Sequence, residues 1–128
     1  MRLLDSNIVI YATRPSFEWL RDEVLAEPFA VSQATRIEVL GWHAITPEDV
    51  NDLETFLAAG TILPITDAVA DRAVALRQRR KMSLGDALIA ATALEYDCDL
   101  LTRNIADFAA IPDLRVINPL DEERSQDG

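Results

Sequence analysis

Short apolar runs alternate along the chain with stretches in which apolar residues recur at helical spacing. The short runs predict strands at 2–5, 29–31, 61–65, 99–102 and 116–117. The helical spacing predicts helices at 8–12, 16–26, 33–41, 47–58, 67–80 and 84–96. Strands that alternate with helices in this way predict an α/β fold, a three-layer α/β/α sandwich with a central, mainly parallel sheet.

Residues that favour helix starts support several of these boundaries. Thr46 is followed by Pro47 and by an acid at the third helical position, which is a strong start signal. The helix after the second strand has two candidate caps, Ser32 and Thr35. If Thr35 is the cap, Glu38 completes a capping box, whereas a start at Ser32 leaves Glu38 too deep in the helix to cap it.

The length and composition fit one folded domain. The chain has 128 residues, 49% of them hydrophobic, and we expect a domain over 1–120 followed by a polar tail over 121–128. Cys98 is the only cysteine, and its apolar surroundings predict a buried structural thiol. The chain opens without an apolar leader and has no run long enough to span a membrane, so we expect a cytoplasmic protein without membrane contact.

The net charge of −10 argues against nucleic-acid binding when it is taken alone. Five of the 12 basic residues, however, cluster between 72 and 81. One interpretation is a solvated helix with a cationic end, which suits the helix dipole. The other is a contact with an RNA backbone through Arg79, Arg80 and Lys81.

Acids stand where strands end or where the following helices begin. Asp5 ends the first strand, Glu38 lies in the helix after the second, and Asp86 opens an apolar helix that should be buried. Asn104 and Asp107 follow the fourth strand. Each acid alone can be explained as a helix cap. Because these places converge at one edge of a parallel sheet, three carboxylates would repel one another unless a hard cation such as Mg²⁺ or Mn²⁺ lies between them.

Other catalytic arrangements find little support. His43 is the only histidine, and the four glycines are too scattered to form a phosphate-binding loop. A receiver-like phosphoacceptor domain would also be small, acidic and α/β. It would pair two acids near the first strand and place a lysine after the last one, but Asp5 stands alone and Lys81 precedes the Asp86 helix.

Four segments resemble, in order, the motifs of the PIN-domain family. Leu3-Leu4-Asp5-Ser6-Asn7 is similar to its opening "hhDTN" motif. The others are Ser32-x-x-Thr35-x-x-Glu38-Val39, Ser83-Leu84-Gly85-Asp86-Ala87-Leu88-Ile89-Ala90-Ala91-Thr92-Ala93 and Leu101-Thr102-Arg103-Asn104-Ile105-Ala106-Asp107-Phe108. The combination and the chain length resemble the VapC-type toxin branch of the family.

The resemblance implies an Mg²⁺- or Mn²⁺-dependent endoribonuclease that cleaves RNA phosphodiesters with a metal-activated water. It implies catalytic roles for Asp5, Glu38, Asp86 and Asp107, and metal binding by Asp5, Asp86, Glu38 and Asn104, with either Asn104 or Asp107 in the fourth position. Supporting roles would fall to Ser6, Asn7, Thr35 and Thr102.

Two departures from the family pattern are visible. Ser6 stands where threonine is usual, and Asn104 replaces an acid, which predicts one metal ion rather than two. The implied partners are a VapB-type antitoxin, the RNA substrate and a second copy of the chain in a homodimer, for which Trp19 and Trp42 are candidate contacts if they are not core residues. The alternative function is a catalytically weak PIN scaffold that binds protein or RNA.

Overall fold

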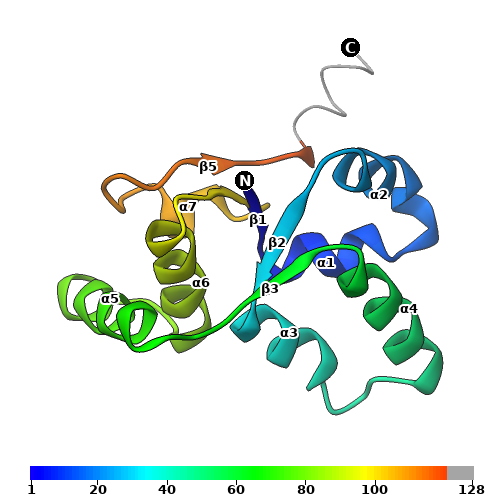
Figure 1. Ribbon diagram of the computed structural model, residues 1–128, viewed down its shortest axis with the longest axis horizontal. Helices are drawn as coiled ribbons and strands as arrows, with labels where there is room; N and C mark the ends of the chain where they lie inside the picture. The colour runs from blue at the N-terminus through cyan, green and yellow to red at the C-terminus, as the bar shows by residue number, and fades with distance from the viewer. Residues whose placement is uncertain (121–128) are drawn as a thin grey trace.

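A sheet of five strands organises the computed structural model, which describes residues 1–120 (Figure 1). The strands are β1 (Arg2–Leu4), β2 (Phe29–Ser32), β3 (Thr61–Leu63), β4 (Asp99–Leu101) and β5 (Val116–Ile117). Their order is β3-β2-β1-β4-β5, and every neighbouring pair is parallel. The carboxyl ends of β1, β2 and β4 therefore meet at one edge, as predicted. The expected polar tail at 121–128 lies outside the described residues.

Helices cover both faces of this sheet and make the predicted three-layer sandwich. They are α1 (Ser6–Ala12), α2 (Glu18–Leu25), α3 (Gln33–Leu40), α4 (Pro47–Ala58), α5 (Asp67–Arg79), α6 (Leu84–Glu95) and α7 (Ile105–Phe108), with a 3₁₀ helix at Pro15–Phe17. The short helix α7 was not predicted. The predicted start at 16 was also early, because that turn is 3₁₀ and α2 begins at Glu18. None of the helices within 1–120 is long and apolar enough to cross a membrane.

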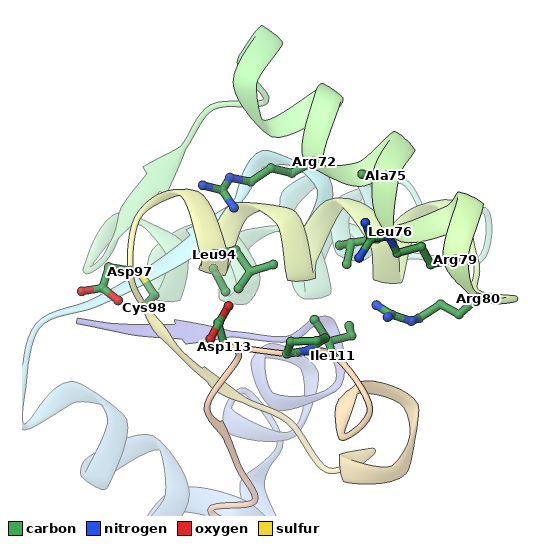
Figure 2. A pocket seen from close by; sticks show the side chains of 12 residues that line it. Arg72, Ala75, Leu76, Arg79, Arg80, Leu94, Asp97, Cys98, Ile111 and Asp113 are labelled. Atoms are coloured by element: carbon green, nitrogen blue, oxygen red, sulfur yellow. The ribbon is translucent and has the colours of Figure 1, made fainter.

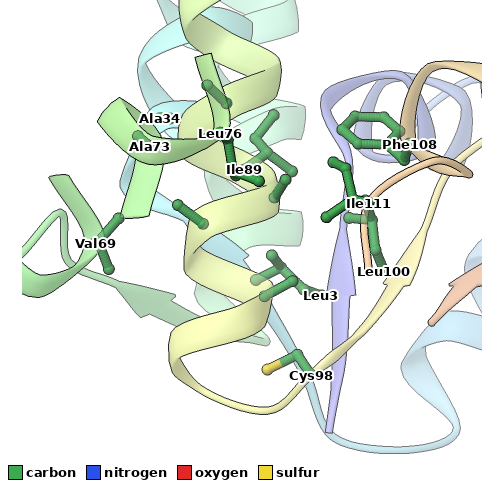
Figure 3. Packing of buried hydrophobic residues seen from close by; sticks show 14 of the residues in the cluster. Leu3, Ala34, Val69, Ala73, Leu76, Ile89, Cys98, Leu100, Phe108 and Ile111 are labelled. Atoms are coloured by element: carbon green, nitrogen blue, oxygen red, sulfur yellow. The ribbon is translucent and has the colours of Figure 1, made fainter. Parts of the chain in front are cut away.

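Alternate residues of the strands supply two hydrophobic cores. Leu3 and Leu100 face α5 and α6, whereas Leu4 and Leu101 face α1, α2 and α4. Figure 3 shows the first core, in which Leu3 and Leu100 pack with α6 and with residues that follow β4. Cys98 is buried there, as expected, and burial raises the pKa of its thiol.

The hydrogen bonds at the helix starts show which polar residues near the strand ends are helix caps. Ser32 caps α3, because its hydroxyl accepts the backbone N–H of Ala34 at 3.1 Å. Thr35 is therefore not the cap but a fully buried residue within α3, and Glu38 lies too deep to cap the helix. Thr46 forms the predicted capping box with Asp49 at the start of α4.

The two tryptophans lie in different environments. Trp19 is partly buried against the second core, which fits a packing role. Trp42 is 55% exposed and lies beyond the end of α3, so core packing does not account for it.

Candidate active site

Asp5 directly follows β1 and caps α1, and its carboxylate is buried with 4% of the residue exposed. The backbone N–H of Ser6 donates to Oδ1 at 2.8 Å. The hydroxyl of Thr102, just past β4, donates to Oδ2 at 2.6 Å, and the amide of Asn7 donates to the same oxygen at 3.2 Å. Capping uses only part of this carboxylate, which is also fixed in orientation by side chains from two segments.

Burial is the main influence on the charge state of Asp5. Burial raises the pKa of this carboxyl, because a charged group loses hydration in the interior. The hydrogen bonds from Thr102, Ser6 and Asn7 lower the pKa, and the negative charge of Asp107 raises it. The net shift of the pKa is upward, so the three hydrogen bonds do not fully offset the cost of burying the ionised carboxylate.

Asp86 lies in the first turn of α6 and is half-buried. Burial is again the largest cause of its raised pKa, followed by the charges of Asp5 and Asp107. A hydrogen bond from Ser83 opposes the shift, and the charge of Glu38 adds to it. Four acids from separate segments of the chain therefore share one electrostatic environment.

Glu38 is exposed, but its carboxylate is held on two sides. The hydroxyl of Ser6 donates to Oε1 at 2.8 Å. Oε2 lies against Gly85 in the first turn of α6, where an added Cβ would be only 2.8 Å from it. No separate role was predicted for Gly85 from the sequence. A glycine inside a helix start is costly and often marks a close approach, and that signal could have identified it.

Two residues after β4, Asn104 and Asp107, are the candidates for the fourth position of the predicted metal site. Asn104 is exposed and precedes α7, and its backbone N–H donates to the Thr102 hydroxyl at 3.0 Å. Asp107, on α7, is the residue whose charge raises the pKa of both Asp5 and Asp86. Asp107 rather than Asn104 therefore adds negative charge near Asp5 and Asp86, and the unpredicted helix α7 places it. Thr35 is fully buried, and its hydroxyl has no hydrogen-bond partner within 1–120.

Comparison with known proteins agrees with this geometry. The family model for the PIN domain matches residues 2–114. The chain belongs to the PIN domain family. Two relatives from Mycobacterium tuberculosis are Ribonuclease VapC19, 32% identical over 90% of this chain and 98% of its own length, and Ribonuclease VapC10, 30% identical over 90% and 91%.

Solved structures of similar fold include toxin–antitoxin assemblies. A toxin–antitoxin complex from Klebsiella pneumoniae contains a chain that is 35% identical, with a TM-score of 0.75 over 93% of this chain and 98% of that one. The FitAcB structure from Neisseria gonorrhoeae matches at 27% identity and a TM-score of 0.73 over 94% and 99%. The family resemblance of the four motifs is thus confirmed.

Two arginines of the basic segment line a cavity that the four acids do not line. Arg79 and Arg80 line a cavity of about 440 Å³ between α5, α6 and residues 111–113, shown in Figure 2. Lys81 is exposed in the link between α5 and α6. The cavity is not lined by Asp5, Glu38, Asp86 or Asp107. Arg79 and Arg80, for which RNA contact was predicted, therefore face a cavity distinct from the acid cluster.

The acid cluster of the PIN domain has the donor chemistry of a divalent-cation site. Its acidic side chains offer oxygen ligands, and their mutual repulsion is what a cation removes. Within residues 1–120, no three such side chains are close enough to enclose an ion by themselves. Mg²⁺ usually keeps several of its waters and binds one or two carboxylates directly, so this spacing suits an ion held partly through water.

Proposed function

We propose that this PIN domain is a metal-dependent endoribonuclease of the VapC type and the toxin of a toxin–antitoxin pair. The observation that carries the proposal is the convergence of Asp5, Glu38, Asp86 and Asp107 on one electrostatic site at the edge where β1 and β4 end. The VapC ribonuclease class predicted from the motifs is confirmed by relatives that match nearly the whole chain.

The residues divide into ligands and groups that orient them. Asp5 and Asp86 would hold one Mg²⁺ or Mn²⁺ ion, and Glu38 and either Asp107 or Asn104 would contact the ion or its waters. Thr102 and Asn7 fix the carboxylate of Asp5 through their hydrogen bonds. A divalent ion at this place would polarise a phosphate and lower the pKa of water.

Glu38 is an exposed acid in this arrangement, as is Asp107. Because Ser6 holds one of its oxygens at 2.8 Å, the carboxylate is fixed although it is exposed. In the proposed mechanism it accepts the proton of the water that attacks an RNA phosphodiester. This route leaves a 5′-phosphate and a 3′-hydroxyl, whereas a 2′,3′-cyclic phosphate would require attack by the ribose 2′-hydroxyl and would contradict it.

Protein partners follow from the same assignment. A chain of the Klebsiella pneumoniae toxin–antitoxin complex covers nearly all of this one, which supports an antitoxin of the VapB type as partner. Apolar side chains of Ile37, Trp42 and Leu84 are more than half exposed, and they are our candidates for the contact of a homodimer. The cytoplasmic location stays a prediction.

Cleavage of total cellular RNA by the purified protein tests the activity. Wild type should cut RNA in Mg²⁺ and stop in EDTA, and Asp86→Asn should not cut, although asparagine can still occupy the first turn of α6. Asp71→Asn is the matched control, because Asp71 is an exposed acid on α5. End-group analysis of the fragments should find 5′-phosphates.

Two results would overturn the proposal. Equal cutting by wild type and Asp86→Asn would mean that a contaminant cleaves the RNA. No cutting by wild type across transfer, ribosomal and messenger RNA, together with tight RNA or protein binding, would favour the non-catalytic scaffold.

A further inference from the structure

Two arginines lie over one tyrosine ring beside the acid cluster. The guanidinium carbons of Arg14 and Arg103 are 5.3 Å and 5.4 Å from the centre of the Tyr11 ring, which is cation–π distance. Arg103 also donates a hydrogen bond to the Tyr11 hydroxyl. Phe17 extends the aromatic surface, with its ring centre 4.9 Å from that of Tyr11. We call Arg14, Tyr11 and Arg103 the arginine–tyrosine cluster.

The cluster is connected to the acids by short contacts. Tyr11 lies four residues after Asn7 on α1, so the two side chains share one face of the helix about 6 Å apart along its axis. The backbone N–H of Arg103 donates to Asn7 Oδ1 at 3.3 Å, and Asn7 in turn donates to Asp5. The residue before Arg103 is Thr102, which also holds Asp5. The arginine–tyrosine cluster is therefore fixed about one helical turn from the buried acid.

The charges of this cluster are not used to bind acids of the folded chain. Arg2, Arg72 and Arg115 pair with carboxylates, but within residues 1–120 Arg14 and Arg103 form no such pair. Both arginines are exposed, and they have no acidic partner here even though acids outnumber basic residues in the chain, whose net charge is −10. Two guanidiniums are thus held together at the surface and remain available to an anionic ligand.

We propose that the arginine–tyrosine cluster binds the RNA strand next to the phosphate that is cleaved. Guanidiniums bind phosphate oxygens in bidentate fashion, and an aromatic ring beside them suits single-stranded RNA. A phosphate strand approaching the four acids meets repulsion, and two cations one turn away offset it. This inference rests on the proposed ribonuclease function and deepens it. The RNA strand would then lie over the arginine–tyrosine cluster and not over Arg79 and Arg80. None of the four acids lines the cavity that contains Arg79 and Arg80.

The test measures RNA binding without cleavage, in full-length protein that carries Asp86→Asn. Arg14→Gln and Arg103→Gln remove charge but keep much of the side-chain length. Each should weaken binding of a single-stranded RNA oligonucleotide and reduce the slope of log affinity against log salt by about 0.7. Arg115→Gln is the matched control, because Arg115 pairs with Asp99 at the opposite, amino end of β4. It should leave the slope unchanged.

The ring is tested separately, with RNA binding measured in the same Asp86→Asn background and cleavage measured in protein that retains Asp86. Tyr11→Phe should retain most RNA affinity, because the ring remains, whereas Tyr11→Leu should lose more. In cleavage assays the arginine variants should raise KM more than they lower kcat, since they contact the strand and not the reacting atoms. A purely structural role for the cluster would instead appear as a lower Tm without a change in salt slope.

The outcomes separate this inference from the proposed function. If wild type fails to cut RNA, the ribonuclease proposal fails. If wild type cuts RNA but Arg14→Gln and Arg103→Gln keep its salt slope, only the present inference fails. A loss of slope in Arg79→Gln and Arg80→Gln instead would move the strand to the α5 cavity. Weaker antitoxin binding with unchanged RNA binding would identify the cluster as a protein-binding surface and overturn the proposal.

Discussion

Replacing Gly85 with alanine is expected to impair the metal site without weakening the fold. A Cβ at this position would lie 2.8 Å from Glu38 Oε2, 3.1 Å from its Cδ and 3.2 Å from Oε1. Ordinary van der Waals contact begins near 3.4 Å, so the carboxylate must retreat by about 0.6 Å. The obstacle is the far end of an exposed side chain, which can move at little cost to the core.

The Gly85→Ala substitution should leave the stability of the fold unchanged or raise it slightly, although it lowers activity. Gly85 lies in the first turn of α6 and no glycine in residues 1–120 has a positive φ, so alanine fits the backbone. Alanine exceeds glycine in helix propensity by up to about 1 kcal/mol in a helix interior, and by less in a first turn. We therefore expect a Tm equal to that of wild type or up to about 4 °C higher.

The loss of function should be measurable in two ways. Because a displacement of about 1 Å in a catalytic group can cost roughly a hundredfold, we expect cleavage to slow by about tenfold. Calorimetry should show weaker Mn²⁺ binding. Glu38→Asp is shorter by one methylene, so combining it with Gly85→Ala should recover part of the Mn²⁺ affinity, although Glu38→Asp alone lowers it.

Two results would refute this reasoning. Wild-type Mn²⁺ affinity and cleavage in Gly85→Ala would mean that the position of Glu38 against α6 does not matter. A fall in Tm that parallels the lost activity would assign Gly85 to the fold instead.

Three further predictions concern the buried acids. Thr102→Val removes the 2.6 Å hydrogen bond to Asp5, so calorimetry should find Mg²⁺ affinity reduced by about tenfold or more. Without metal, the raised pKa values of Asp5 and Asp86 mean that the native state binds more protons than the unfolded state. The free energy of unfolding should therefore fall as the pH rises from about 4 through the raised pKa values. Urea titrations of Asp86→Asn should show a smaller fall. Saturating Mg²⁺ should raise the Tm of wild type at neutral pH and that of Asp86→Asn far less.

Local sequence signals were sufficient for most of the framework. The capping box at Thr46 depends on neighbours within one helical turn, and it is present in the structure. The alternation that sends Leu3 and Leu4 to opposite faces is likewise a property of a single strand. The choice between Ser32 and Thr35 remained open, because both are good caps and only packing of α3 decides between them.

The site depended more on contacts between distant segments. Nothing local to 104–108 indicates that a four-residue helix places the charge of Asp107 near Asp5 and Asp86. Isolated helices of that length are not stable in water, so tertiary packing of Phe108 must fix it. The proximity of Gly85 to Glu38 and the stacking of Arg103 on Tyr11 also join residues far apart in the chain, beyond the reach of motif spacing.

The capping and ligand interpretations of the acids are compatible, and Asp5 shows why. Its Oδ1 accepts the N–H of Ser6 as an N-cap does, which leaves Oδ2 to Thr102 and Asn7. A cap alone needs no burial, and an exposed cap would keep an ordinary pKa. Burial and the charge of Asp107 raise the pKa of Asp5 although three donors surround it, so the fold tolerates a cost that capping does not explain. A bound cation would remove that cost, so the free energy of metal binding and the stability of the folded chain would be coupled at this residue.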